Sequence, residues 1–183
     1  MGGDKSLLDW RGKTFLERLL AAVETAGLDP VRVVLGANAE AVQQKVSLGP
    51  DEVVVNREWE KGQLTSLIAG LHSLSTEVAA AVVCLVDHPC VSSRLLRTLA
   101  EKFRETRKAI VLPTYQGRRG HPVVFAARLF DELRAAPLDV GARHVVRQNS
   151  AEVLEIPVEE EGVVLNINDP AAYEKILQIA PPG

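Results

Sequence analysis

The sequence AAAVVCLVDHP, residues 79 to 89, decides the fold of this chain. Residues 79–86 are apolar without interruption, which is typical of a strand covered on both faces inside an α/β sheet. Asp87 follows where His88 and Pro89 end the apolar run. Because ligands of open α/β sheets bind at the carboxyl ends of the strands, this carboxylate is a candidate functional group. A strand that ends in aspartate can equally cap the next turn, so the rest of the chain has to decide.

Strand and helix patterns alternate along the remaining sequence. Strands are predicted from runs of β-branched residues at 31–35, 52–55, 79–86, 109–113, 121–125, 153–158 and 163–167. Helices are predicted from apolar residues at helical spacing at 14–26, 39–46, 64–74, 92–106, 128–135 and 142–148, and after Asp169. Residues 1–13 are predicted as loop. The pattern predicts one domain, residues 1–183, with a three-layer α/β/α sandwich around a mixed, mostly parallel sheet.

Composition narrows the function class. The chain has 183 residues, 46% of them hydrophobic, and a net charge of −3 with acids and bases interspersed. This argues against a nucleic-acid surface or a membrane patch and favours small partners. Cys84 and Cys90 match no zinc or redox spacing, so we expect reduced thiols. Without an apolar run near the ~18 residues of a membrane span, or a signal-peptide core, we expect a cytoplasmic protein.

Two segments carry groups suited to a nucleotide. Lys5 lies in GGDKSLL, where Gly2 and Gly3 let backbone amides approach an anion and the lysine adds a point charge, although a solvated lysine is the ordinary alternative. The segment NREWEKGQLTS follows a predicted strand and precedes a helix, where amides and hydroxyls can meet phosphates. Helix capping, with Trp59 covering the core, is its alternative. The candidates in this segment are Asn56, Gly62, Gln63, Thr65 and Ser66.

Basic residues gather in two later loops. GRRGHP contains Arg118, Arg119 and His121, a compact cationic group on a turn that suits phosphate, with an exposed basic loop as the alternative. Arg143 lies in DVGAR beside a second glycine.

Two amides precede the last predicted helix. Asn166 and Asn168 flank Ile167, so both side chains point to one side if the segment is extended. Their oxygens are then placed to meet Asp87 across the crevice. Capping of the helix by Asn168 and Asp169 is the alternative.

Taken together, these segments resemble the MobA-like nucleotidyltransferase family, and most closely its molybdenum cofactor cytidylyltransferase branch. The resemblance covers essentially the whole chain. It implies a Rossmann-like three-layer fold of the nucleotide-diphospho-sugar transferase type, and magnesium as cofactor. The segments that carry it are MGGDKSLL, NREWEKGQLTSLIAGL, AVVCLVDHP, LPTYQGRRGHPVVF, LDVGARHVV and NINDPAAYEKIL.

The resemblance also implies roles for individual residues. Lys5 looks like the lysine that contacts nucleotide phosphates, and Asp87 looks like the magnesium-binding aspartate, so these two are the expected catalytic residues. The nucleotide side would include Gly2, Gly3, Lys5, Asn56, Gly62, Gln63, Thr65 and Ser66. The acceptor side would include Arg118, Arg119, His121 and Arg143. The metal side would include Asp87, Asn166 and Asn168.

Two departures from the family pattern stand out. The family opens with an apolar strand and a glycine-rich loop ending in Arg-Met-Gly, of which only Met1, Gly2 and Gly3 remain here. We therefore expect the first strand to be missing, and a chain without it to be less stable and less active than one that carries it. Where the family has Asp-Ile-Asp, this chain has Asn166, Ile167 and Asn168, whose neutral oxygens can still coordinate magnesium.

The expected reaction moves CMP from CTP to the terminal phosphate of a molybdopterin-type acceptor and releases pyrophosphate. The expected partners are CTP or another NTP, this acceptor, and a molybdoenzyme or its chaperone. Transfer of GMP or another nucleotide is the alternative within the family. A catalytically silent protein that binds a nucleotide or the pterin is the alternative outside it. A nicotinamide-dependent oxidoreductase ranks third, because no G-x-G-x-x-G follows a strand.

Overall fold

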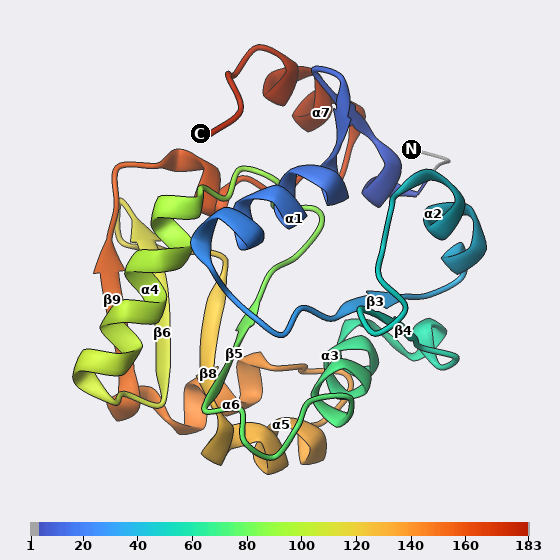
Figure 1. Ribbon diagram of the computed structural model, residues 1–183. Helices are drawn as coiled ribbons and strands as arrows, with labels where there is room; N and C mark the ends of the chain where they lie inside the picture. The colour runs from blue at the N-terminus through green and yellow to red at the C-terminus, as the bar shows by residue number, and fades with distance from the viewer. Residues whose placement is uncertain (1–3, 183) are drawn as a thin grey trace.

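A five-stranded mixed sheet forms the centre of the molecule (Figure 1). The structure is a computed structural model and describes residues 4–182. The order of strands is β5-β8-β6-β7, and β9 pairs with β6. β8 runs antiparallel to both β5 and β6, whereas β9 runs parallel to β6, so β5, β6 and β9 share one direction. The strands are β5 (Ala80–Val83), β6 (Ile110–Tyr115), β7 (Arg118–Arg119), β8 (Val123–Ala126) and β9 (Val153–Pro157).

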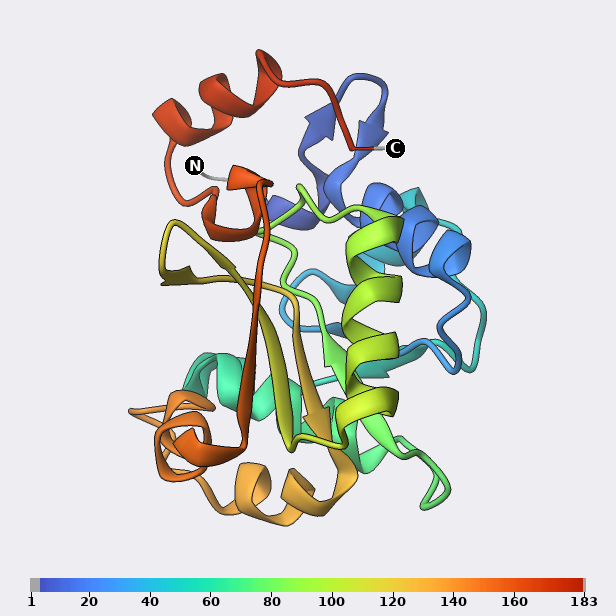
Figure 2. The same ribbon diagram turned by 90° about the vertical axis from the view of Figure 1, so that its left-hand side faces the viewer.

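Helices cover both faces of this sheet, as Figure 2 shows. Because successive strand residues face opposite sides, Ile110 and Phe125 pack toward α3, α5 and α6, whereas Val111 and Val124 pack toward α4. The predicted three-layer α/β/α sandwich is therefore confirmed. The helices of these layers are α3 (Gln63–His72), α4 (Ser93–Thr106), α5 (Phe130–Ala135) and α6 (Arg143–Gln148); the short 3₁₀ helix η3 (Ala127–Leu129) precedes α5, and η4 (Ser150–Glu152) follows α6.

A smaller unit lies beside the central sheet. Its parallel strands β3 and β4 pair only with each other in the part of the chain that the structure describes. Apolar residues of β3 pack against α1 and α2. Within residues 4–182 no strand joins β3 to β5. The elements of this unit are α1 (Phe15–Ala26), β3 (Val33–Leu35), α2 (Ala39–Lys45), β4 (Val53–Val55) and the 3₁₀ helix η2 (Trp59–Lys61).

The start of the chain differs from its prediction as loop. It contains the 3₁₀ helix η1 (Lys5–Leu7) and a hairpin of β1 (Asp9–Trp10) and β2 (Lys13–Thr14). Trp10 is fully buried and lies edge-on to Phe15, in a cluster with residues of α7 (Pro170–Leu177). Burial of this indole against a distant helix stabilises the hairpin, which its polar sequence did not indicate.

Two predicted strands also differ. The strand expected at 79–86 ends at Val83, and its four residues are only partly buried. Among the described residues β5 pairs on one edge alone, so the second edge that would bury it is open. The segment expected to be extended at 163–167 begins instead as the 3₁₀ helix η5 (Glu161–Val164), because Leu165 N–H bonds back to the carbonyl of Gly162. No helix among residues 4–182 has the length and apolar character needed to cross a membrane.

Candidate functional site

Asp87 lies just beyond the carboxyl end of β5, where the sequence placed it. The chain turns there, with the N–H of His88 donating to the carbonyl of Leu85 at 3.0 Å. The carbonyl of Asp87 accepts from the N–H of Ile167 at 2.8 Å, which ties the segment before α7 to the same point. The carboxylate keeps 20% of its surface exposed. It is therefore open to a ligand while its backbone is fixed.

Lys5 reaches this carboxylate from the start of the chain. The side chain of Asp4 caps η1 by accepting from the N–H of Ser6 at 2.9 Å, which fixes the backbone of Lys5. Lys5 Nζ lies 3.9 Å from Asp87 Oδ2 and donates to Asn168 Oδ1. Three residues predicted for the site, remote in sequence, thus meet at one point. The Lys5 ammonium therefore lies between two oxygens, one of the Asp87 carboxylate and one of the Asn168 amide.

The amide pair before α7 has the predicted alternation. Asn166 and Asn168 are exposed on either side of Ile167, which is fully buried. Although the segment is not a strand, both amides are exposed, and Asn168 is connected to Asp87 through Lys5. Capping of α7 falls to Asp169, which accepts from the N–H of Ala172 at 2.8 Å, so Asn168 is left for the site.

Two histidines stack beside Asp87. The rings of His88 and His121 have centroids 4.7 Å apart and are tilted by 46°. Burial, together with the charge of His88, lowers the pKa of His121 to about 4 against the opposing effect of Asp87. Burial also lowers the pKa of His88, against the opposing effect of Asp87. Both Nδ1 atoms are buried without a hydrogen-bond partner in the described part of the chain. Both rings are therefore neutral near pH 7.

The basic loop is not the compact cationic group that the sequence suggested. Arg118 and Arg119 form β7 and pair with the end of β6, so their side chains leave opposite faces of the ribbon. Arg119 is bound to Glu155 Oε1 through Nε at 2.9 Å and Nη2 at 2.7 Å. Arg118 and Arg143 are exposed. The charge of Arg143 helps to lower the pKa of His121, so it lies on the same side of the site.

Several polar side chains of the segment after β4 form hydrogen bonds within that segment and with the start of α3. Asn56, which is 5% exposed, donates to Thr65 Oγ1 at 2.9 Å and to Ser66 Oγ at 3.0 Å. Thr65 Oγ1 also lies 2.8 Å from the carbonyl of Gly62. These hydrogen bonds tie Asn56 and Thr65 to the start of α3, but neither side chain caps this helix, whose N-cap residue is Gly62. Gly62 and Gln63 remain exposed at the start of α3.

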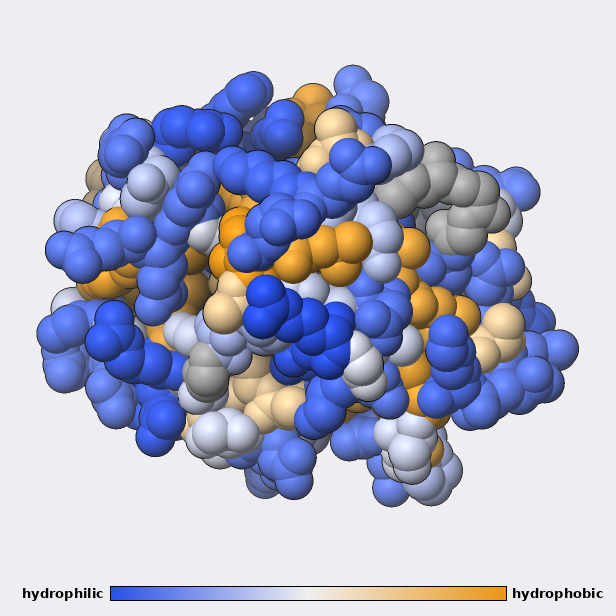
Figure 3. Space-filling view, turned by 90° about the horizontal axis from the view of Figure 1, so that it is seen from above, coloured by the Kyte–Doolittle hydropathy of each residue, from blue (hydrophilic) through white to orange (hydrophobic). Residues whose placement is uncertain are grey.

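Several residues at the site were not expected from the sequence. Asp4 and Asn38 meet through Asn38 Nδ2 and Asp4 Oδ2 at 3.3 Å, and His88 stacks on His121. Only the position of Asp4 next to Lys5 offered a signal. Gly2 and Gly3, predicted for the nucleotide side, lie outside the described residues. The end of the molecule that carries α7 is seen from above in Figure 3, where hydrophilic side chains surround smaller apolar areas.

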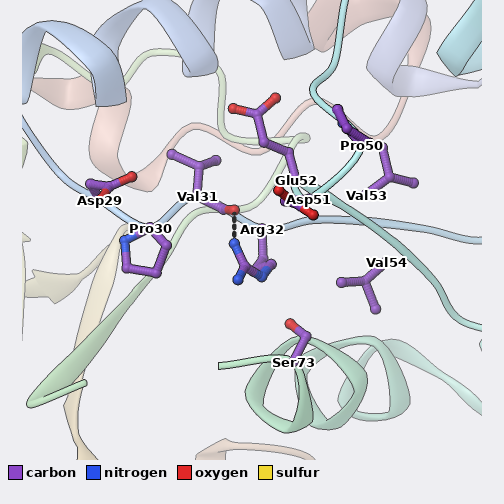
Figure 4. Close-up of a pocket in the computed structure, with 10 residues that line it drawn as sticks. All are labelled: Asp29, Pro30, Val31, Arg32, Pro50, Asp51, Glu52, Val53, Val54 and Ser73. Carbon is purple, nitrogen blue, oxygen red and sulfur yellow. Dashed lines mark hydrogen bonds between the residues drawn. The ribbon is translucent and has the colours of Figure 1, made fainter. Parts of the chain in front are cut away.

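A hollow of about 590 Å³ lies elsewhere, at the amino ends of β3 and β4 (Figure 4). None of the predicted site residues lines it. Ligands of α/β sheets bind at the opposite, carboxyl ends, so this hollow is not the candidate site. Its lining residues are Asp29, Pro30, Val31, Arg32, Pro50, Asp51, Glu52, Val53, Val54 and Ser73.

The fold is that of an α/β protein, and the Lys5–Asp87 pair lies beyond the carboxyl end of β5, where ligands of such sheets bind. The model of the MobA-like NTP transferase domain matches residues 1–153, and the chain belongs to this family. The family and its class of reaction, nucleotidyl transfer, agree with the prediction from the sequence.

Relatives of known name carry two different activities. Nicotine blue oxidoreductase of Paenarthrobacter nicotinovorans is 35% identical over 154 residues, covering 80% of this chain and 74% of that protein. A probable molybdenum cofactor guanylyltransferase of Opitutus terrae is 28% identical over 180 residues, covering 93% and 85%. The chain is thus related both to guanylyltransferases and to a protein named for a redox reaction.

Solved structures confirm the fold. Rv0371c from Mycobacterium tuberculosis H37Rv aligns with a TM-score of 0.87 at 28% identity, over 98% of this chain and 92% of that chain. Its complex with manganese aligns with a TM-score of 0.83, over 97% and 94%. The fold of Rv0371c therefore corresponds to nearly the whole length of this chain.

Proposed function

We propose that this protein transfers CMP from CTP to the terminal phosphate of a molybdopterin-type acceptor. The observation that carries the proposal is the meeting of Lys5, Asp87 and Asn168 beyond the carboxyl end of β5. In the reaction an acceptor phosphate oxygen bonds to the α-phosphorus of CTP. The bond from that phosphorus to the bridging oxygen breaks, and pyrophosphate leaves with the electron pair. The attacking oxygen is already anionic, so no general base is needed, and alignment and charge neutralisation suffice.

Lys5 binds the phosphates in this proposal. Its side chain is 32% exposed, and the capped turn of η1 fixes its backbone at the site. It can turn from Asn168 to phosphate oxygens without a change in the backbone. A point charge there stabilises the negative charge that develops on the leaving pyrophosphate.

Asp87, with Asn168 and Asn166, would hold magnesium. The donor set fits, since carboxylate and amide oxygens are hard ligands and Mg²⁺ commonly takes one or two carboxylates together with substrate phosphates. The position of the Lys5 ammonium between Asp87 and Asn168 marks a point where a cation can lie. The manganese complex of Rv0371c gives further support for a divalent ion. When bound, the ion supplies neutralisation of phosphate charge.

In this proposal the acceptor binds on the side of the site that carries His121 and Arg143. Arg143 and Arg118 are exposed cations available to its phosphate, whereas Arg119 must first leave Glu155. The choice of CTP rests on the resemblance to the cytidylyltransferase branch. The guanylyltransferase relatives make GTP the competing donor.

Pyrophosphate release tests the proposal directly. We would incubate the protein with Mg²⁺ and each of the four NTPs, with and without molybdopterin. The expected result is acceptor-dependent release with CTP, lowered at least 100-fold by Asp87→Asn, since a metal-binding charge contributes roughly several kcal/mol. Asp51→Asn, an exposed carboxylate in the turn before β4 and at the amino ends of the strands, is the matched control and should leave the rate unchanged. Pyrophosphate release with GTP alone would mean that the nucleotide donor is GTP and not CTP. No release with any NTP would overturn the proposal.

A redox function is the second candidate, favoured by the 35% identity to nicotine blue oxidoreductase. The same preparation, mixed with nicotine blue and a reduced nicotinamide dinucleotide, separates the two candidates. Loss of the blue absorbance that depends on the protein would support this candidate, and its absence together with pyrophosphate release would support nucleotidyl transfer.

A further inference from the structure

Trp59 is an exposed tryptophan that the proposed reaction does not yet use. It opens η2, just after β4, and is 44% exposed, whereas the other tryptophan, Trp10, is fully buried. The base of its side chain packs on Gly36, where an added Cβ would lie 3.0 Å from Trp59 Cβ and 3.1 Å from Cγ. Trp59 belongs to none of the hydrophobic clusters that the described residues form. The indole is therefore anchored at its base without covering the core.

A short chain of contacts connects Trp59 to the site. Gly36 follows the carboxyl end of β3, and Asn38 is two residues further on, at most about 7 Å away along the backbone. Asn38 Nδ2 donates to Asp4 Oδ2 at 3.3 Å, and Asp4 caps the turn that carries Lys5. Figure 1 shows α2 close to this start of the chain. Trp59 therefore borders the Lys5 side of the site.

The opposite side of the site is reached through Asp87. His88 follows Asp87 in the chain, and its ring packs on that of His121. The charge of Arg143 contributes to the lowered pKa of His121. The acceptor groups of the proposed reaction are thus separated from Trp59 by the Lys5–Asp87 pair. A flat heteroaromatic ring beside Trp59 would consequently belong to the nucleotide that Lys5 binds.

We propose that Trp59 is the stacking surface for the base of the nucleoside triphosphate, and so a nucleotide-binding residue. This inference rests on the proposed function. An indole offers a large, rigid π-face, and a base gains affinity by stacking on it without hydrogen bonds. Gly36 allows Trp59 to take this position, because any larger residue at 36 would push the indole away.

Intrinsic fluorescence and calorimetry test the proposal. We would titrate wild-type protein, Trp59→Phe and Trp59→Leu with CTP, GTP and inorganic tripolyphosphate in the presence of Mg²⁺. Since Trp10 is buried, wild-type emission should be quenched by a nucleotide through Trp59, and tripolyphosphate should leave it unchanged. Trp59→Leu should weaken nucleotide binding by roughly 5- to 100-fold, the range of one lost base–aromatic stack. Trp59→Phe should retain most of the affinity, and neither variant should alter tripolyphosphate binding.

The outcomes separate this inference from the proposed function. If nucleotides bind wild type and Trp59→Leu equally, with matching melting curves, the stacking role is wrong and nucleotidyl transfer stands. Equal quenching by tripolyphosphate would mean that the loop moves when phosphate binds, and would also overturn stacking. A free pterin that quenches Trp59 where no NTP does would assign the surface to the acceptor instead. If no NTP binds wild type, both proposals fail together.

Discussion

Gly120→Ala probes the packing that holds the acceptor side of the site. An added Cβ would lie 2.8 Å from the carbonyl carbon of Val163 and 2.9 Å from its Cγ2, and nearer still to its carbonyl oxygen. Val163 is fully buried, and its oxygen accepts from the N–H of His121 at 2.8 Å. The clash can be relieved only by moving buried backbone or by losing this hydrogen bond. Overpacking costs about 1–3 kcal/mol and a lost hydrogen bond about 0.5–1.5 kcal/mol, which gives roughly 2–4 kcal/mol.

Thermal melting measures this cost. At about 2–4 °C per kcal/mol for a chain of this size, the midpoint of Gly120→Ala should fall by roughly 5 to 15 °C. Gly49→Ala is the control, because its Cβ would meet only the flexible side chain of Glu52, with a nearest atom at 3.3 Å. Its midpoint should stay within about 2 °C of wild type. If both variants melt alike, then the close approach of Gly120 to Val163 does not exist and the reasoning is refuted.

Acid stability and thiol reactivity give two further predictions. The N–H and hydroxyl of Thr14 donate to Glu17 and hold its pKa below the ordinary 4.5, so this capping box stabilises the fold above that pH. The urea midpoint of wild type should exceed that of Glu17→Gln at pH 7, and the difference should shrink as the pH falls below 4.5 and through the lowered pKa of Glu17; a difference as large in acid as at pH 7 would contradict this. Burial raises the pKa of Cys84 to about 12 and that of Cys90 to about 11, the latter helped by Glu161. Because the thiolate is the reactive form, a disulfide reagent at pH 8 should label native protein at least about tenfold more slowly than protein in denaturant, and equal rates would exclude the buried thiols.

The sequence predicted the position of Asp87 because the evidence for it is local. The apolar run and the residues that stop it indicate where the chain turns, although β5 itself ends at Val83, and the convergence of strand ends then determines which loops meet. The same logic placed Asn166 and Asn168 near Asp87, and the structure brings Asn168 to Lys5 beside that carboxylate. The alternation around Ile167 was correct even though the segment is not a strand, since it depends on which side chain is buried.

The start of the chain could not be predicted in the same way. Its strands have two residues each, too short to show a period, and the hairpin depends on Trp10, whose Nε1–H donates to the carbonyl of Ile179 at 3.3 Å. The stacking of His88 on His121 likewise depends on contacts between segments remote in sequence. Such long-range packing is not encoded in any local pattern. The length of β5 was overestimated for a related reason, since hydrophobicity does not show whether both edges of a strand have a partner.

The polar residues at the site fall into two groups, according to whether their side chains already form buried hydrogen bonds within the protein. Asn56 and Thr65 looked like nucleotide ligands, yet their side chains bond to each other and to the backbone, so breaking those bonds would leave buried polar groups unpaired at a cost of about 1–3 kcal/mol each. Their function is to fix the loop after β4, and with it the backbone on which Trp59 is anchored. Lys5 is held by one exposed amide and a distant carboxylate, which a phosphate can replace at little cost. The residues that bind ligand in such a site are therefore those whose present partners are exposed and exchangeable, and the buried hydrogen-bonded residues keep them in position.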